Sequence, residues 1–148
     1  MYEHLLVPVD GSELSNKSVA HALGLAKMLG ASVTGFTAEP PLPVLVVEQS
    51  AVAYDVATFQ EHERRCEAHA RELLEAFAAK AKEAGVAFDG QFVITDSVQD
   101  AIVEAAKKQG CDLIVMATHG RHGLDALIHG SLTKSVLSHC EIPLLIVH

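Results

Sequence analysis

Short runs of apolar residues alternate along this chain with longer segments of helical periodicity, and this alternation restricts the fold more than any other feature. Residues 5–9 form one apolar run, which ends in the turn residues Asp10, Gly11 and Ser12. Residues 112–117 form another. Strands that alternate with helices are joined by right-handed crossovers, which make neighbouring strands parallel. The sequence therefore predicts an α/β domain with an open, mostly parallel sheet flanked by helices.

Turn and capping residues indicate where these elements begin and end. Ser12 is positioned as the N-cap of the first helix, and Gly30 is positioned to end it. Thr58 and Glu61 fit a capping box for a long helix that ends at Gly85. We expect strands over residues 5–9, 32–38, 86–95, 112–117 and 142–147. We expect helices over residues 13–29, 58–84, 97–109 and 131–139.

Residues 39–57 have the weakest pattern in the chain. Pro40, Pro41 and Pro43 fall here, and proline lacks the N–H group that a helix interior or a central strand requires. The apolar residues 44–47 could form a strand. We nevertheless expect this segment to be a loop that lies over one end of the sheet.

Length and composition suit a single aliphatic core. The 148 residues are a typical domain length, and we treat residues 1–148 as one domain. Hydrophobic residues make up 49% of the chain and aromatic residues only 5%, which is typical of buried parallel strands. In the long helix, Phe59, Cys66 and Phe77 fall on one face, which we expect to pack in the core. Pro143 predicts an edge or dimer-facing position for the last strand.

Charge and cysteine content restrict the partners and the compartment. The net charge of −8 disfavours binding to nucleic acid or to an anionic membrane, although backbone N–H groups can still bind a phosphate. Cys66, Cys111 and Cys140 are odd in number and lack CxxC spacing, which favours a reducing compartment. We see no signal peptide and no apolar run of membrane-spanning length. These features predict a cytoplasmic protein without nucleic-acid or membrane partners.

Two segments are expected to meet at one edge of the sheet and form a binding site. Ligands of open α/β sheets bind beyond the carboxyl ends of the strands. Residues 8–12 follow the first strand, and residues 116–133 begin at the end of the fourth. Asp10 could accept a hydrogen bond from a ribose hydroxyl or an adenine amino group, or help to hold a metal ion with a phosphate.

The second segment has features of a phosphate site. Gly120 and Gly130 allow a close approach of the backbone to a ligand. Gly130 and Ser131 open a helix whose free N–H groups favour an anion, and the hydroxyls of Ser131 and Thr133 can donate to phosphate oxygens. The alternative is that the two glycines serve tight turns and that Ser131 is an ordinary N-cap.

Over essentially its whole length, the chain resembles the universal stress protein family. The resemblance rests on residues 5–12, 112–123 and 142–147 and on the helix start at Gly130 and Ser131. The ATP-binding branch of the family carries a glycine, two residues, a glycine, nine residues and then Gly-Ser or Gly-Thr. Gly120, Gly130 and Ser131 match this motif, and Ala117 stands in place of its first glycine.

The resemblance implies a Rossmann-like, five-stranded sheet of order 3-2-1-4-5 and a homodimer formed partly through the last strand. It also implies an adenine nucleotide (ATP, ADP or AMP, with or without Mg²⁺) at the site described above. Carried over by position, the nucleotide-binding residues are Pro8, Val9, Asp10, Thr37, Met116, Ala117, Gly120, Gly130, Ser131, Leu132 and Thr133. No catalytic base is carried over.

Three functions are compatible with these features. The first is an adenine-nucleotide-binding stress or signalling module, with at most slow hydrolysis because the chain lacks the Gly-Lys-Ser/Thr ending of a P-loop. The second is a dimeric interaction or chaperone-like protein that binds no nucleotide, which the alanine at position 117 keeps open. The third is a hydrolase or nucleotidyl-transferring enzyme on the same fold.

Histidines and cysteines provide no further site. His119, His122 and His129 lie close together in the glycine-containing segment, but no Cys or acidic residue accompanies them at a telling spacing. We therefore expect no metal site there. Cys66 is expected to be a core residue.

Overall fold

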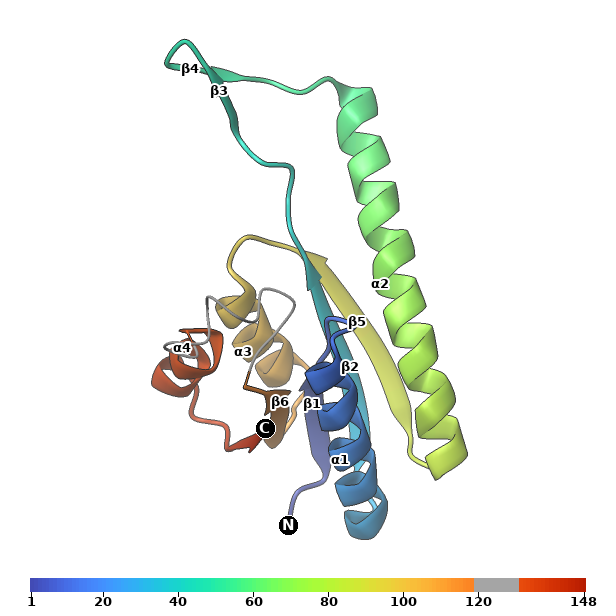
Figure 1. Cartoon of the computed structure of the whole chain (residues 1–148). Helices are drawn as coiled ribbons and strands as arrows, with labels where there is room; N and C mark the ends of the chain where they lie inside the picture. Colours follow the sequence, from blue (N-terminus) through green and yellow to red (C-terminus); the bar gives the residue numbers. More distant parts are fainter. Residues whose placement is uncertain (119–130) are drawn as a thin grey trace.

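The central feature of the molecule is a parallel β-sheet with helices on both faces (Figure 1). The structure is a computed structural model that describes residues 1–118 and 131–148. Within those residues the sheet has five strands in the order β5-β2-β1-β6-β7. The strands are β1 (His4–Pro8), β2 (Ser32–Glu39), β5 (Phe88–Ile94), β6 (Leu113–Ala117) and β7 (Leu144–Val147). Counted along the chain, this is the predicted 3-2-1-4-5 arrangement, so the predicted fold class is confirmed.

Helices cover both faces of the sheet (Figure 1). The helices are α1 (Glu13–Leu29), α2 (Val56–Ala84), α3 (Val98–Lys108) and α4 (Ser131–His139). Alternate residues of a strand point to opposite faces, so β1 contributes to two cores. Leu5 and Val7 pack with α1 and α2, and Leu6 packs with α3 and α4. In the described ranges, no helix combines the length and apolar character that a bilayer span requires.

Local capping chemistry accounts for the helix ends, with one correction. The Ser12 hydroxyl accepts from the Ser15 N–H at 3.1 Å, and Gly30 ends α1 in the left-handed conformation, as predicted. The expected start of α2 at Thr58 is wrong, because the helix begins two residues earlier, at Val56. Asp55 is its N-cap, and the Asp55 carboxylate accepts from the Thr58 N–H at 2.7 Å. A carboxylate at this position also interacts favourably with the helix dipole.

The first turns of α2 extend beyond the sheet, which corrects a second expectation. Phe59 is 48% exposed rather than buried in the core, because no strand lies beneath this end of the helix (Figure 1). Its ring instead contacts that of Tyr54, with the ring centroids 5.7 Å apart. Cys66 and Phe77 lie further along the same helix and are buried, as predicted.

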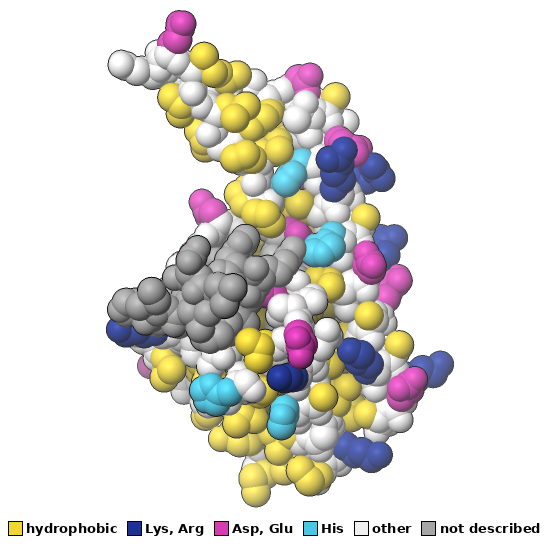
Figure 2. Space-filling model, viewed as in Figure 1, with side chains coloured by type: hydrophobic (Ala, Val, Ile, Leu, Met, Phe, Trp, Pro, Cys, Tyr) yellow, Lys and Arg dark blue, Asp and Glu magenta, His cyan; other side chains and the backbone are white. Residues whose placement is uncertain are grey.

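A β-hairpin replaces the loop that we expected between β2 and α2. Strands β3 (Leu45–Val47) and β4 (Ser50–Val52) pair in antiparallel fashion. Glu48 and Gln49 form the two-residue turn with φ values of 50° and 65°. The hairpin projects away from the sheet, and its exposed side chains are largely apolar (Figures 1 and 2). The prolines suggested a loop, but the residues with high strand propensity lie just after them.

Gly35 in β2 leaves room for two aromatic rings, and this generates a prediction. A Cβ atom at position 35 would lie 2.8 Å from atoms of Phe77 and of Phe88. We expect Gly35→Ala to lower the free energy of unfolding by about 1–3 kcal/mol, because the core is overpacked. Chemical denaturation measures this change. Gly24→Ala is the control, since a Cβ there meets nothing within 4 Å and alanine favours helix. Equal stability of the two variants would contradict the packing argument.

Asp112 connects the amino-terminal ends of β1 and β6. Its carboxylate accepts from the N–H of Glu3 at 2.8 Å and from the N–H of His4 at 3.0 Å. Burial by itself raises the pKa of Asp112, but hydrogen bonds from the backbone N–H groups of Glu3, His4 and Asp112, together with the nearby His4 side chain, lower the pKa below its usual range. Since the native pKa is depressed, the stabilisation is present at neutral pH and is lost as the pH falls through that native pKa.

Asp112→Ala is therefore expected to destabilise the protein at neutral pH by about 1 kcal/mol, because two backbone donors lose their acceptor. The difference from the parent should shrink under acid conditions. Urea unfolding at several pH values measures both quantities. Asp89→Ala is the control, because it removes an exposed carboxylate that accepts a hydrogen bond from the Gln91 side chain on the same strand, and it should have little effect. A pH-independent loss in Asp112→Ala would argue against a role for the ionised carboxylate.

Candidate functional site

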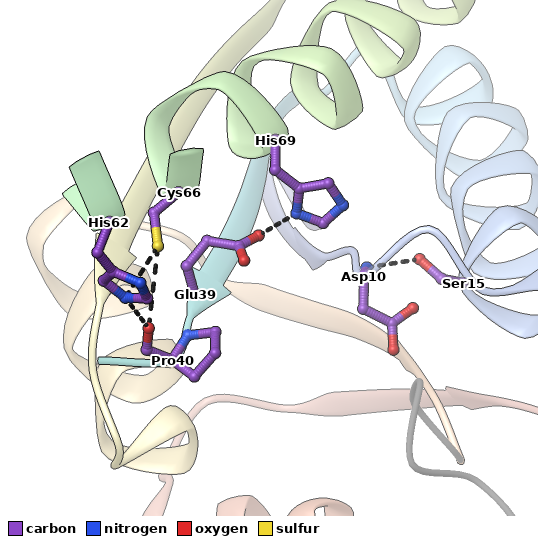
Figure 3. Close-up of polar contacts among 7 residues, drawn as sticks. All are labelled: Asp10, Ser15, Glu39, Pro40, His62, Cys66 and His69. Carbon is purple, nitrogen blue, oxygen red and sulfur yellow. Dashed lines mark hydrogen bonds and ion pairs between the residues drawn. The ribbon is translucent and has the colours of Figure 1, made fainter. Parts of the chain in front are cut away.

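The loop that follows β1 is held in one conformation by its own polar groups. The Val9 N–H donates to the Phe36 carbonyl at 2.8 Å, so the end of β1 lies beside β2. The Asp10 carboxylate accepts from the Ser12 N–H at 2.9 Å, and the Asp10 N–H donates to the Ser15 hydroxyl at 3.2 Å (Figure 3). These contacts place the carboxylate of Asp10 at the carboxyl edge of the sheet.

Thr37 lies on β2 at the same edge and has an unusual hydroxyl. Its side chain is buried, and Oγ1 has no hydrogen-bond partner among residues 1–118 and 131–148. Leaving such a group unpaired in the interior costs about 1–3 kcal/mol. Thr34 on the same strand shows the ordinary arrangement, because its buried hydroxyl bonds to Nε2 of His4 at 2.8 Å.

The third wall of the site comes from β6 and α4. Leu5 and Leu6 pair with Leu113 and Ile114, so the carboxyl ends of β1 and β6 lie side by side. Met116 is buried at the end of β6. In the first turn of α4, Leu132 packs on the same core cluster as Met116, and Oγ1 of Thr133 is buried without a partner.

The structure thus brings the predicted nucleotide-binding residues of three adjacent strands to one edge of the sheet: Pro8, Val9, Asp10, Thr37, Met116 and Ala117. Leu132 and Thr133 lie in the first turn of α4, and Leu132 packs on the same core cluster as Met116. Gly120 and Gly130 lie outside the described residues, as do His119, His122 and His129. Ser131 is the first residue of α4. In the described part of the chain, the buried side-chain polar atoms without a partner are the hydroxyls of Thr37 and Thr133, and both belong to the predicted set.

Sequence reasoning missed a pair of residues beside this site. Nδ1 of His69 lies 2.6 Å from Oε1 of Glu39, whose side chain is only 6% exposed (Figure 3). Glu39 ends β2, and His69 comes from the middle of α2. One signal was available: a glutamate at the end of an otherwise buried strand needs a partner. The sequence alone could not show that the partner lies 30 residues away.

Cys66 and His62 form a second contact one helical turn from that pair. Sγ of Cys66 lies 3.3 Å from Nε2 of His62 (Figure 3). Burial raises the pKa of the Cys66 thiol, and the nearby carboxylates of Glu39 and Glu63 raise it further. Burial likewise raises the pKa of Cys111 to about 11. Both thiols are therefore protonated at neutral pH, which gives no support to a reactive thiolate.

In the described ranges, no group of three or more His, Cys, Asp or Glu residues is arranged to hold a metal ion. The Glu39–His69 and His62–Cys66 contacts are thus two pairs rather than one coordination site.

Comparisons with known proteins agree with this architecture. A family model, described as the universal stress protein family, matches residues 1–148. Universal stress protein A homolog 1 of Coxiella burnetii is 31% identical over 140 residues, which cover 92% of this chain and 89% of that protein.

Solved structures show the same fold. The hypothetical protein MJ0577 superposes with a TM-score of 0.83 at 22% identity, over 99% of this chain and 96% of that chain. A universal stress protein solved in complex with cAMP has a TM-score of 0.69 at 25% identity, over 99% and 97% of the two chains. The match of the family model over the whole chain and the 31% identity to the Coxiella burnetii protein show that this protein belongs to the universal stress protein family.

Proposed function

We propose that this protein is a nucleotide-responsive stress or signalling module that binds an adenine nucleotide at the carboxyl ends of β1, β2 and β6. The observation that carries the proposal is the pair of buried, unpartnered hydroxyls on Thr37 and Thr133. Buried polar groups in proteins are almost always paired, so two exceptions at the predicted site favour a ligand that pairs with them. The proposed ligand is ATP, ADP or AMP, with Mg²⁺ as an accompanying ion for the polyphosphates.

Each wall of the site has a role in this proposal. Pro8, Val9, Asp10 and Thr37 face the adenine and ribose. Met116, Ala117, Gly120, Gly130, Ser131, Leu132 and Thr133 face the ribose and phosphates. The helix start at Ser131 suits an anion, because the first N–H groups of a helix have no acceptor within the helix and the helix dipole is positive there. This local preference for an anion is compatible with the overall charge of −8.

Related proteins support the choice of nucleotide. The relative at 25% identity was solved with cAMP. More distant proteins of the same fold, from Archaeoglobus fulgidus and Arabidopsis thaliana, were solved with dAMP and AMP. We expect hydrolysis to be slow at most, because the sequence has no P-loop lysine.

Replacement of the unpaired hydroxyls tests the site directly. Thr37→Val and Thr133→Val keep the side-chain shape and remove a hydroxyl that has no partner among the described residues. We expect each variant to be as stable as the parent or more stable without nucleotide. With ATP and Mg²⁺ the parent should be stabilised by about 2.7 kcal/mol at a hundred times the dissociation constant, and the variants by less. Thermal unfolding with and without nucleotide measures both effects.

Thr34→Val is the matched control, because the Thr34 hydroxyl is buried on the same strand but bonds to His4. We expect this variant to lose stability and to keep the full shift with nucleotide. If Thr37→Val and Thr34→Val behave alike, the unpaired hydroxyl of Thr37 has no ligand-binding role.

We also propose that the protein is a cytoplasmic homodimer whose subunits meet through β7. This strand forms one edge of the sheet, where it pairs only with β6 among the described strands. Beside it, Leu145 and the α1 residues Leu25 and Met28 line a shallow apolar surface. Met28 is 79% exposed, and such a side chain gains from burial against an identical surface.

Leu145→Lys is expected to convert the dimer to a monomer, because it places a charge in the apolar interface. Light scattering after size-exclusion chromatography measures the mass. Phe92→Lys is the control, since Phe92 is similarly exposed but lies on β5, at the opposite edge of the sheet. A parent that is already monomeric, or a Leu145→Lys variant that remains dimeric, would contradict this interface.

The hairpin favours a second candidate function, that of an interaction or chaperone-like module that binds no nucleotide. Val46 and Val47 are more than half exposed on β3, where a protein partner could cover them. This candidate is distinguished by the thermal experiment above, because it predicts no stabilisation of the parent by nucleotide.

A further inference from the structure

The contact between Glu39 and His69 controls which nitrogen of the imidazole carries the proton. An ionised carboxylate can only accept a hydrogen bond, so the contact of 2.6 Å requires a proton on Nδ1 of His69. In a neutral imidazole, Nε2 is then the acceptor. Glu39 is almost fully buried, and the carboxylate is therefore held in place by its surroundings.

Helix packing places His69 beside the proposed nucleotide site. Leu73 lies against the loop after β1, because a Cβ on Gly11 would be 3.0 Å from its Cδ2 atom. His69 is one helical turn from Leu73 on the same face of α2. Glu39 is two residues beyond Thr37 in β2, so both side chains point to the face that α2 covers. Figure 3 shows the imidazole on the Asp10 side of Glu39.

The second nitrogen of His69 is available to a ligand. The side chain is 39% exposed. Nδ1 makes the contact with Glu39, and among the hydrogen bonds of the described residues none involves Nε2. Adenine and guanine differ at the corresponding edge of the base: adenine carries an amino group that donates, and guanine carries an oxygen that accepts. An acceptor on the protein therefore pairs with adenine and opposes guanine.

We propose that Nε2 of His69 accepts a hydrogen bond from the amino group of the bound adenine, and that Glu39 positions His69 for this by holding the proton on Nδ1. The inference rests on the proposed nucleotide-binding function and adds base selectivity to it. His69 is the specificity-determining residue, and Glu39 acts through it.

Binding of AMP and GMP to the full chain tests the inference, because the two ligands share ribose and phosphate and differ only in the base. Isothermal titration calorimetry in a mildly alkaline buffer, in which imidazoles are neutral, gives both affinities. We expect the parent to prefer AMP. His69→Ala should weaken AMP binding about tenfold, the effect of one lost hydrogen bond, and should not weaken GMP binding, because the removed acceptor opposes guanine.

Two further variants separate selectivity from structure. In Glu39→Gln the side-chain amide can donate a hydrogen bond to Nδ1 of His69, which allows the imidazole proton to move to Nε2. Nε2 then no longer accepts from adenine, so the ratio of AMP affinity to GMP affinity should fall. His62→Ala is the matched control on α2, because His62 bonds to the Pro40 carbonyl at 2.8 Å. It should keep the parent's preference. Thermal unfolding without nucleotide confirms that each variant is folded.

The possible failures are distinguishable. If the parent binds AMP and His69→Ala keeps both the affinity and the preference, the inference is wrong and nucleotide binding stands. If the parent binds AMP and GMP equally, selectivity is absent and the inference is again wrong. If the parent binds neither nucleotide, the inference falls together with the proposed function.

Discussion

The hydrogen bonding of β1 to a parallel strand on each side is the constraint on which the rest of the structure depends. β1 pairs with β2 on one side and β6 on the other. Its residues Leu5, Leu6 and Val7 are fully buried, alternately against the two helical layers. Each such side chain contributes about 1.5–3 kcal/mol on burial, so this short strand stabilises both cores. Each connection between neighbouring parallel strands crosses a face of the sheet and returns the chain to the same starting edge. The carboxyl ends of all the strands therefore lie at one edge.

The two ends of β1 show how differently the protein treats its polar groups. At the amino-terminal end, Asp112 satisfies the N–H groups of Glu3 and His4, and His4 satisfies Thr34. At the carboxyl end, Thr37 remains unpaired. Unsatisfied groups lower stability, and proteins retain them mainly where function requires them. The contrast within one sheet is the physical basis for placing the site at the carboxyl edge.

Helix α2 connects this site with the outer part of the molecule. Its carboxyl-terminal half packs Phe77 against the sheet, and its middle brings His69 to Glu39. Its first turns extend past the sheet and carry the base of the β3–β4 hairpin (Figure 1). One helix thus connects the core, the edge of the proposed site and the exposed β3–β4 hairpin.

The parts of the structure that the sequence determined are those governed by nearby residues. Ser12 and Gly30 delimit α1 as predicted, because capping depends on groups within one turn of the chain. The apolar runs likewise predicted the strands. Where two local signals competed, the prediction was wrong: Asp55 caps α2 although Thr58 also fitted a capping box. The prolines similarly led to the prediction of a loop where the β3–β4 hairpin lies.

The tertiary structure alone decided which residues distant in the chain face one another. Glu39 and His69 lie 30 residues apart, and their contact depends on how α2 crosses the sheet. Whether a buried threonine hydroxyl is paired likewise depends on the side chains packed around it. Thr37 and Thr34 lie on the same strand, but among the described residues only the Thr34 hydroxyl has a partner, His4. The sequence by itself determined the fold class and the order of the five strands and four helices around the sheet, because these follow from periodicity and turn chemistry. Pairing between polar side chains was decided only by packing, since it depends on distances that periodicity does not encode.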